Sequence, residues 1–206
     1  MDRSFLFVLG SSRPDGNTEQ LARTAARRLP SGTEQRWLAL RDLPLAPFTD
    51  RRHADPAGHT LPAPGSNERL LLDATLDATD IVIASPVYWY SVSSATKLYL
   101  DHWSGWLRLP GVDFKQRMAR KTYWAVSALA EEDPAYARPL LDTVRYSAEY
   151  FGARFAGGLV GVGVDRPGQI MADAETLARA RGFFTADATG PLGLRAEAGV
   201  SAGVAG

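Results

Sequence analysis

A loop of small and hydrogen-bonding residues, 10–18, directly follows the apolar run 5–9 and precedes a segment with helical periodicity. The first backbone N–H groups of a helix have no intrahelical partner, and the helix dipole favours an anion at that end. Gly10 and Gly16 allow the backbone to come close to a ligand, and the loop supplies hydroxyl, amide and guanidinium donors. The loop therefore predicts a phosphate site, which is typical of a nucleotide-like cofactor.

The spacing within the loop excludes the commonest phosphate loops. Asn17 stands where a Walker loop needs lysine, and the next glycine after Gly10 is Gly16, so the dinucleotide pattern G-x-G-x-x-G is absent. A similar loop serves small tyrosine phosphatases, but their chemistry needs a cysteine nucleophile and this chain has no cysteine. We therefore expect binding of a phosphate monoester rather than its cleavage. The alternative is an ordinary turn between a strand and a helix.

Composition predicts a compact enzyme of one α/β domain. The chain has 206 residues, with 23 Lys+Arg and 23 Asp+Glu, so its charge does not indicate nucleic acid or an anionic membrane as partner. The apolar run 5–9 is too short for a signal-peptide core or a membrane span. The absence of cysteine excludes disulfides, thiolate metal sites and iron–sulfur clusters. We expect a cytoplasmic protein.

Apolar runs alternate with amphipathic segments along the chain. Nearly continuous apolar runs are typical of parallel strands that are covered on both faces. We therefore expect an α/β fold, a three-layer doubly wound five-stranded parallel sheet. The domain should span residues 1–185, and the Ala/Gly-rich tail, 186–206, should be loosely packed or disordered. The expected strands are 5–9, 36–40, 81–84, 122–127 and 158–162, and the expected helices are 19–28, 67–79, 95–103, a longer one capped by Asp133-Pro134 and stopped by Gly152, and 170–178.

A second signal follows the third expected strand. Ligands of open parallel sheets bind beyond the carboxyl ends of the strands, and Pro86 and three consecutive aromatic residues, 88–90, follow such an end. Aromatic side chains can flank a planar heterocycle while neighbouring backbone amides bind its polar edge. Alternatively, these aromatics pack under a neighbouring loop or form a subunit interface.

These two loops resemble those of a known family. Residues 10–18 are similar to the FMN phosphate loop, and residues 85–93 with Lys97 and Asp101 to the second flavin loop, of the NADPH-dependent FMN reductase family in the flavodoxin-like superfamily. The resemblance spans residues 5–184. It implies strand order 2-1-3-4-5, bound FMN, NADPH or NADH as reductant, and a homodimer whose partner helps to cover the flavin. The cofactor-binding residues it implies are Ser11, Arg13, Gly16, Asn17 and Thr18 for the phosphate, and Pro86, Val87, Tyr88, Trp89 and Ser127 around the ring.

The chain departs from the family pattern in two places. Many members have a glycine pair after the fourth strand, where this chain has the bulkier, acidic segment 127–133. Members with an iron–sulfur cluster carry cysteines after the second strand, so the lack of cysteine excludes that branch.

The remaining polar clusters do not predict chemistry. His53, Asp55 and His59 do not have a recognised ligand spacing, and we interpret their loop as a lid or a dimer contact rather than a metal site. Lys97 and Asp101 have the spacing of a surface ion pair on a helix. We predict no catalytic side chain, because the redox chemistry belongs to the cofactor.

The function expected from the resemblance is an FMN-dependent NAD(P)H oxidoreductase that passes hydride to the flavin and electrons on to a small acceptor such as a quinone. The alternatives are a flavodoxin-type electron carrier, which is usually strongly acidic, and a binding protein without a redox role. We expect a homodimer, because the aromatic loop together with Trp103, Trp106 and Leu107 would expose too much apolar surface on a monomer.

Overall fold

The computed structural model describes residues 3–51, 53 and 59–185. Asp55 and the Ala/Gly-rich tail, 186–206, lie outside these residues, so the predictions made for them stay predictions.

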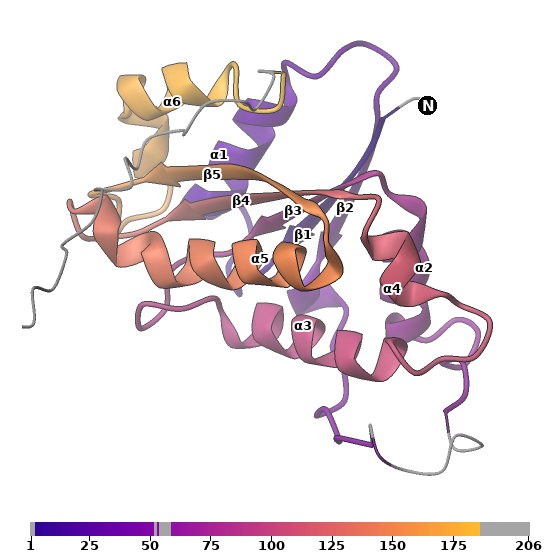
Figure 1. Ribbon diagram of the computed structural model, residues 1–206. Helices are drawn as coiled ribbons and strands as arrows, with labels where there is room; N and C mark the ends of the chain where they lie inside the picture. Colours follow the sequence, from indigo (N-terminus) through magenta and orange to yellow (C-terminus); the bar gives the residue numbers. More distant parts are fainter. Residues whose placement is uncertain (1–2, 52, 54–58, 186–206) are drawn as a thin grey trace, which may run out of the picture.

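A parallel sheet of five strands forms the centre of the molecule (Figure 1). The strand order is β2-β1-β3-β4-β5, which confirms the predicted flavodoxin-like α/β fold. Side chains of β1 and β3 are almost all buried, as a sheet covered on both faces requires. The strands are β1 (Ser4–Leu9), β2 (Glu34–Ala39), β3 (Asp80–Ala84), β4 (Thr122–Ala128) and β5 (Arg154–Gly161).

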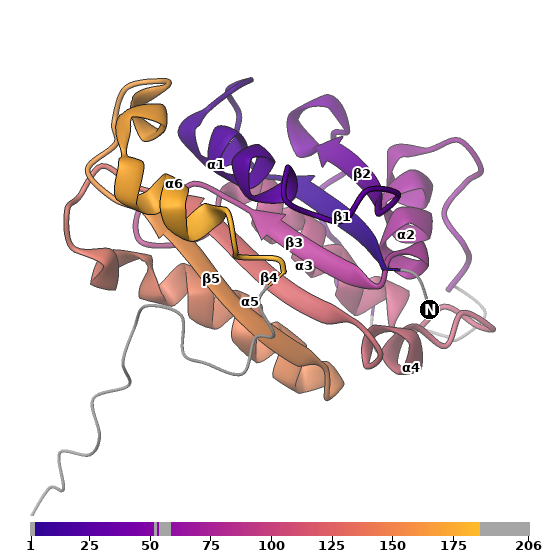
Figure 2. The ribbon, with the colours of Figure 1, turned by 90° about the horizontal axis from the view of Figure 1, so that it is seen from above.

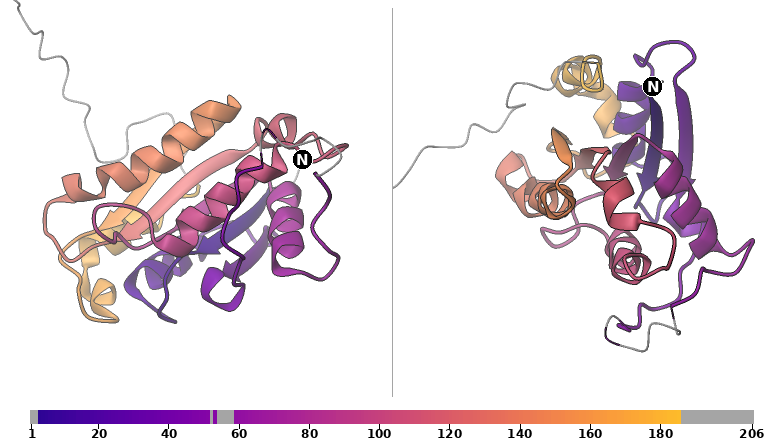
Figure 3. Two further views of the ribbon diagram at one scale, coloured as in Figure 1. Left: turned by 90° about the horizontal axis from the view of Figure 1, so that it is seen from below. Right: turned by 45° about the vertical axis from the view of Figure 1, so that its right-hand side comes forward.

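Helices cover both faces of this sheet (Figures 1 and 2). One face packs against α1 (Asn17–Ala26) and α6 (Ala174–Ala180) through the apolar cluster that contains Phe7, Leu21 and Trp124. The opposite face is seen in the left view of Figure 3, where the pink α3 and the orange α5 lie in front of the strands. The helices on that face are α2 (Asn67–Asp77), α3 (Ser94–Trp106), α4 (Phe114–Met118) and α5 (Arg138–Phe151).

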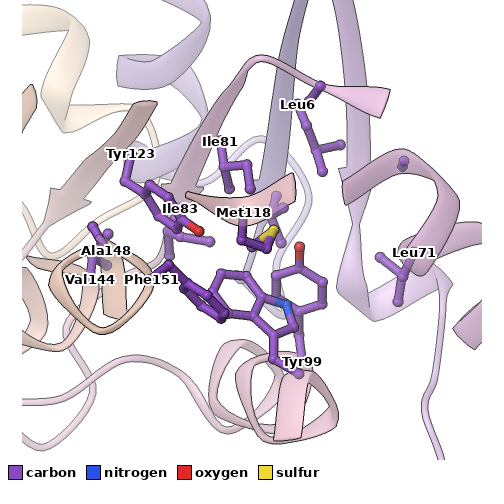
Figure 4. Packing of buried hydrophobic residues seen from close by; sticks show 14 of the residues in the cluster. Leu6, Leu71, Ile81, Ile83, Tyr99, Met118, Tyr123, Val144, Ala148 and Phe151 are labelled. Atoms are coloured by element: carbon purple, nitrogen blue, oxygen red, sulfur yellow. The ribbon is translucent and has the colours of Figure 1, made fainter. Parts of the chain in front are cut away.

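The core under α3 and α5 is rich in aromatic side chains (Figure 4). Tyr99 is fully buried, and its hydroxyl bonds that of Thr75 at 2.6 Å. Trp103 and Trp106 are only 4% and 1% exposed, so the expectation that they add to the apolar surface is wrong. They face the sheet because residues three and four apart on a helix share one side, and Tyr99, Trp103 and Trp106 form such a row.

Two predicted helices are divided in the structure. Asp133 caps the short 3-10 helix η3 (Pro134–Ala137), and α5 begins only at Arg138. The last predicted helix consists of the 3-10 helix η4 (Gln169–Ala172) followed by α6, whose first turn is capped by the Asp173 carboxylate. At the second place Asp173 both ends η4 and caps α6, because Asp stabilises turns as well as helix starts. At the first place η3 passes directly into α5 through Ala137 and Arg138.

Candidate functional site

A cavity of about 230 Å³ lies at the carboxyl ends of the strands. Loops that follow β1, β3, β4 and β5 contribute to it, which is where an open parallel sheet binds its ligand. Eight of the ten predicted cofactor-binding residues line it; Trp89 and Ser127 do not. The lining residues are Ser11, Arg13, Gly16, Asn17, Thr18, Pro86, Val87, Tyr88, Ala128, Leu129, Ala130, Val164, Asp165 and Pro167.

The loop after β1 presents hydrogen-bond donors to this cavity. The first helical hydrogen bond of α1 runs from the N–H of Gln20 to Gly16 O, so the preceding N–H groups have no partner inside the helix. The Ser11 hydroxyl accepts from the N–H of Arg13 at 3.1 Å and holds the loop in a tight turn. The Arg13 guanidinium is exposed and forms no ion pair with the residues that the structure describes. This donor set fits a phosphate monoester.

A buried carboxylate lies directly behind the phosphate end. Glu19 is 3% exposed in the first turn of α1, where its negative charge would oppose a phosphate. Arg23 pairs with Glu19 Oε1 at 2.7 Å, and Arg41 lies 3.5 Å from Oε2. Arg41 also donates to Arg13 O at 3.5 Å. The two arginines therefore neutralise Glu19, and Arg41 also connects the segment after β2 to the phosphate loop.

Buried hydroxyl groups fix the second loop, 85–93, at its start and to β4. The Ser85 hydroxyl accepts from the N–H of Ser93 at 2.9 Å, and the Ser127 hydroxyl donates to Ser85 O at 2.7 Å. Ser127 is fully buried and does not line the cavity, so it bears on the site through Ser85. Glycine is required at position 10, where the first loop passes close to α3, because a Cβ there would lie 2.0 Å from Thr96 Oγ1.

The aromatic residues after β3 form a small hairpin that projects from the surface. Tyr88 and Ser91 exchange both backbone hydrogen bonds, at 3.0 and 3.1 Å, around a two-residue turn. Both turn residues, Trp89 and Tyr90, have positive φ, at 49° and 62°. Trp89 is 94% exposed, whereas Tyr88 lines the cavity and Tyr90 packs on Tyr136 with ring centroids 5.5 Å apart.

The loop after β5 contributes a wall of the cavity that no sequence motif predicted. Val164, Asp165 and Pro167 line the cavity there. Residues 128–130 line it after β4, next to the predicted Ser127. The rule that ligands bind beyond the carboxyl ends of strands also indicates the β5 loop, although its residues form no recognisable motif.

The other polar candidates lie elsewhere. Lys97 and Asp101 form the expected exposed ion pair, at 2.5 Å. The His102 ring is buried, with Nδ1 3.1 Å from Glu68 Oε1 and Nε2 3.0 Å from Ala46 O, so it holds the chain before α2. Within the described part of the chain, no three His, Asp or Glu side chains are arranged to hold a metal ion. Over the same residues, every helix is too short or too polar to cross a bilayer.

Comparisons with known proteins agree with this geometry. Residues 4–163 match the sequence pattern of the family described as NADPH-dependent FMN reductase. YwqN of Bacillus subtilis (strain 168), provisionally named an NAD(P)H-dependent FMN-containing oxidoreductase, is 30% identical over 174 residues, which cover 84% of this chain and 92% of that protein.

Two solved structures share the fold. The Trp repressor binding protein from Bacillus subtilis superimposes with a TM-score of 0.68 at 24% identity, over 88% of this chain and 98% of the other. An FMN-dependent NADH-azoreductase from Bacillus anthracis str. Ames Ancestor, solved in complex with FMN, superimposes with a TM-score of 0.59 at 10% identity, over 87% of this chain and 96% of its own.

Proposed function

This chain belongs to the NADPH-dependent FMN reductase family and is an NAD(P)H-dependent, FMN-containing oxidoreductase, and from that premise we propose how its own residues hold the cofactor and meet its substrates. The observation that carries the proposal is one cavity that joins the donor-rich loop after β1 to the Pro86–Val87–Tyr88 loop after β3. A phosphate site beside a partly aromatic wall is what a flavin mononucleotide requires.

The phosphate would lie at the first turn of α1. Arg13 would supply a charge-assisted hydrogen bond, and the hydroxyls of Ser11 and Thr18 with the free N–H groups of the helix would supply neutral ones. Glu19 does not repel the phosphate because Arg23 and Arg41 neutralise it. The positive charge of Arg13, which lines the cavity, therefore remains available to the ligand.

The ring would lie against Pro86, Val87 and Tyr88 on one side and residues 128–130 on the other. Bound FMN supplies the chemistry of hydride acceptance and electron transfer. The chain's tasks are to orient the ring, to offer backbone hydrogen bonds to its polar edge and to exclude water from its buried side. Arg13, Tyr88 and Asp165 are the ionisable side chains among the described lining residues, and none of them is required as an acid or a base.

For the electron acceptor we propose a small oxidised molecule such as a quinone. The azoreductase from Bacillus anthracis shows that the same fold serves an enzyme named for reducing azo compounds. We also propose the cytoplasm as the location, because the reductant NAD(P)H is found there.

We further propose a homodimer. Large apolar side chains are exposed on the hairpin beside the cavity and on η3, where Tyr136 packs on Tyr90. Tyr88 is 39%, Trp89 94%, Tyr90 48% and Tyr136 45% exposed. A contiguous apolar patch beside a ligand site favours a partner chain over solvent.

The test is an anaerobic reduction of the purified, FMN-loaded protein. Adding NADPH or NADH should bleach the visible absorbance of the oxidised flavin in a single step, and a quinone should then restore it. Failure of both nucleotides to bleach the flavin, together with one-electron reduction to a stable radical by a chemical reductant, would overturn this proposal and favour an electron carrier.

A further inference from the structure

The side chain of Asn17, the first residue of α1, bonds to the loop that follows β5. Its Nδ2 donates to Arg166 O at 3.0 Å and to Val164 O at 3.4 Å. Its Oδ1 accepts from the N–H of Ile170 at 3.3 Å. These three bonds join residues 147 to 153 positions apart in the chain and close the segment 164–170 against the start of the helix.

This arrangement uses both hydrogens of the Asn17 amide. A primary amide has two N–H donors on nitrogen and acceptor lone pairs on oxygen. With both donors on backbone carbonyls, the side chain has only acceptor capacity left, and a phosphate oxygen is itself an acceptor. The Asn17 side chain therefore has nothing to donate to a phosphate while this segment is closed.

The segment that Asn17 holds is a wall of the cavity. Val164, Asp165 and Pro167 line the same space as Arg13 and the hairpin. A second contact holds the segment from outside: Gln169 Oε1 accepts from the N–H groups of Asp165 and Arg166, at 2.8 and 2.6 Å. Gln169 is exposed and does not line the cavity. Asn17 on the cavity side and Gln169 on the exposed side thus both hold the segment 164–170 by hydrogen bonds.

We propose that Asn17 is a positioning residue that builds the β5 wall of the flavin site rather than a phosphate ligand. The inference rests on the proposed function, since it assumes that the cavity binds FMN. In place of its side chain, Asn17 offers its backbone N–H, which belongs to the free donors of the first turn. The phosphate then depends on Arg13 for charge, and the rest of the flavin depends on Asn17 for the shape of the wall.

Riboflavin separates these two roles, because it is FMN without the phosphate. Affinities of the parent, Asn17→Ala and Arg13→Ala for both flavins are measured by fluorescence titration of the flavin-free protein. Asn17→Ala, which loosens the wall, should lower the affinities for FMN and riboflavin by the same factor, about tenfold. Arg13→Ala should lower the affinity for FMN and leave the affinity for riboflavin unchanged.

Gln169→Ala provides a second variant that cannot act by contact with the phosphate. Gln169→Ala should lower the affinities for FMN and riboflavin by equal factors. The loss should be smaller than in Asn17→Ala. Hydrogen exchange of the flavin-free proteins gives a readout independent of binding: the Ile170 amide should exchange faster in Asn17→Ala, and the Asp165 and Arg166 amides faster in Gln169→Ala.

The outcomes are distinct. If Asn17→Ala weakens FMN alone, or leaves the exchange of Ile170 unchanged, the positioning role is wrong while the flavin site stands. If the parent binds neither flavin, the proposed function is wrong, whatever the exchange shows.

Discussion

At the scale of single residues, Arg13 supplies the positive charge of the site. It is the cation among the described lining residues, and its guanidinium has no acidic partner there. We expect Arg13→Ala to lower the affinity for FMN by about 1.5–3 kcal/mol, the usual range for a hydrogen bond to a charged group. Fluorescence titration of the flavin-free protein measures this.

Arg27→Ala is the matched control, because Arg27 ends the same helix at the opposite terminus and lies outside the cavity. Equal FMN affinity in Arg13→Ala and Arg27→Ala would contradict a phosphate at the start of α1. A smaller loss in high salt than in low salt would agree with a charged contact.

Residue types indicated which side chains gather at the site, but not which way each one turns. The cluster that includes Ser11, Arg13 and Tyr88 could be predicted because the loops after neighbouring parallel strands meet at one edge. The partners of Asn17 and Ser127 could not. Asn17 binds a loop about 150 residues away, and Ser127 donates to Ser85 across the sheet, so both directions depend on tertiary packing.

At the scale of elements, the hairpin after β3 has an unfavourable turn sequence. A two-residue turn with positive φ at both positions favours Asn-Gly, whereas here Trp89 and Tyr90 occupy it. Replacing them together by Asn and Gly should raise the free energy of unfolding of the flavin-free protein by roughly 1–2 kcal/mol, because the left-handed conformation then costs less. Urea unfolding measures this.

Trp89→Phe is the control for this turn, since it keeps the left-handed conformation on a β-carbon and an exposed aromatic ring. It should leave the stability close to that of the parent. If the Asn-Gly variant is no more stable than Trp89→Phe, the turn is not strained. Strain retained at an exposed aromatic tip beside the cavity is typical of a functional contact.

A buried lysine between α4 and β4, Lys121, contacts the C-terminus of α2, and its charge is disfavoured. Lys121 is buried and donates to Leu76 O at 2.9 Å and to Ala78 O, the last carbonyls of that helix. Burial first, and then the neighbouring Arg117, lower the pKa of Lys121 from 10.5 to about 8, although Asp77 and Asp80 act in the opposite direction.

The sign of the pH effect follows from proton counts. Between pH 8 and 10.5 the unfolded chain keeps the Lys121 proton while the folded chain loses it, so this group makes the free energy of unfolding rise with pH over that window. Burial raises the pKa of Tyr99 and Tyr123 above the usual range, which opposes the trend above about pH 10. Urea unfolding from pH 7.5 to 9.5 should show a steeper rise for the parent than for Lys121→Met. Equal slopes would contradict the lowered pKa.

Sequence periodicity located these elements better than their ends. The five strands were found because their apolar runs are nearly continuous, but α4 was missed, since its five residues show too little of a helical period. The start of β5 was placed late because the strand begins at Arg154 with an irregular register against Tyr123 and Trp124. A bulge is determined by its partner strand, which local sequence does not contain.

At the scale of the whole molecule, the strand order agrees with the family resemblance, and right-handed crossovers leave few other arrangements of five parallel strands. What local sequence did not determine was which apolar residues face the core. Trp103 and Trp106 pack against the sheet, so the apolar surface available to a partner lies instead on the hairpin and along the outer side of η3 and α5, at Tyr136, Tyr146 and Tyr150.

This surface leads to a test of assembly. Light scattering at micromolar concentration should return twice the chain mass of 22.3 kDa. Tyr136 packs on Tyr90 and is 45% exposed. Tyr136→Asp would place a charge in this apolar contact, so the measured mass should shift toward that of the monomer. Met171 is also 45% exposed but lies on η4, on the face of the sheet that α1 and α6 cover, and Met171→Asp should leave the dimer intact. A monomeric parent, or equal loss in both variants, would contradict an interface at this face. If Tyr136→Asp also weakens FMN binding while Met171→Asp does not, the partner chain helps to complete the flavin site.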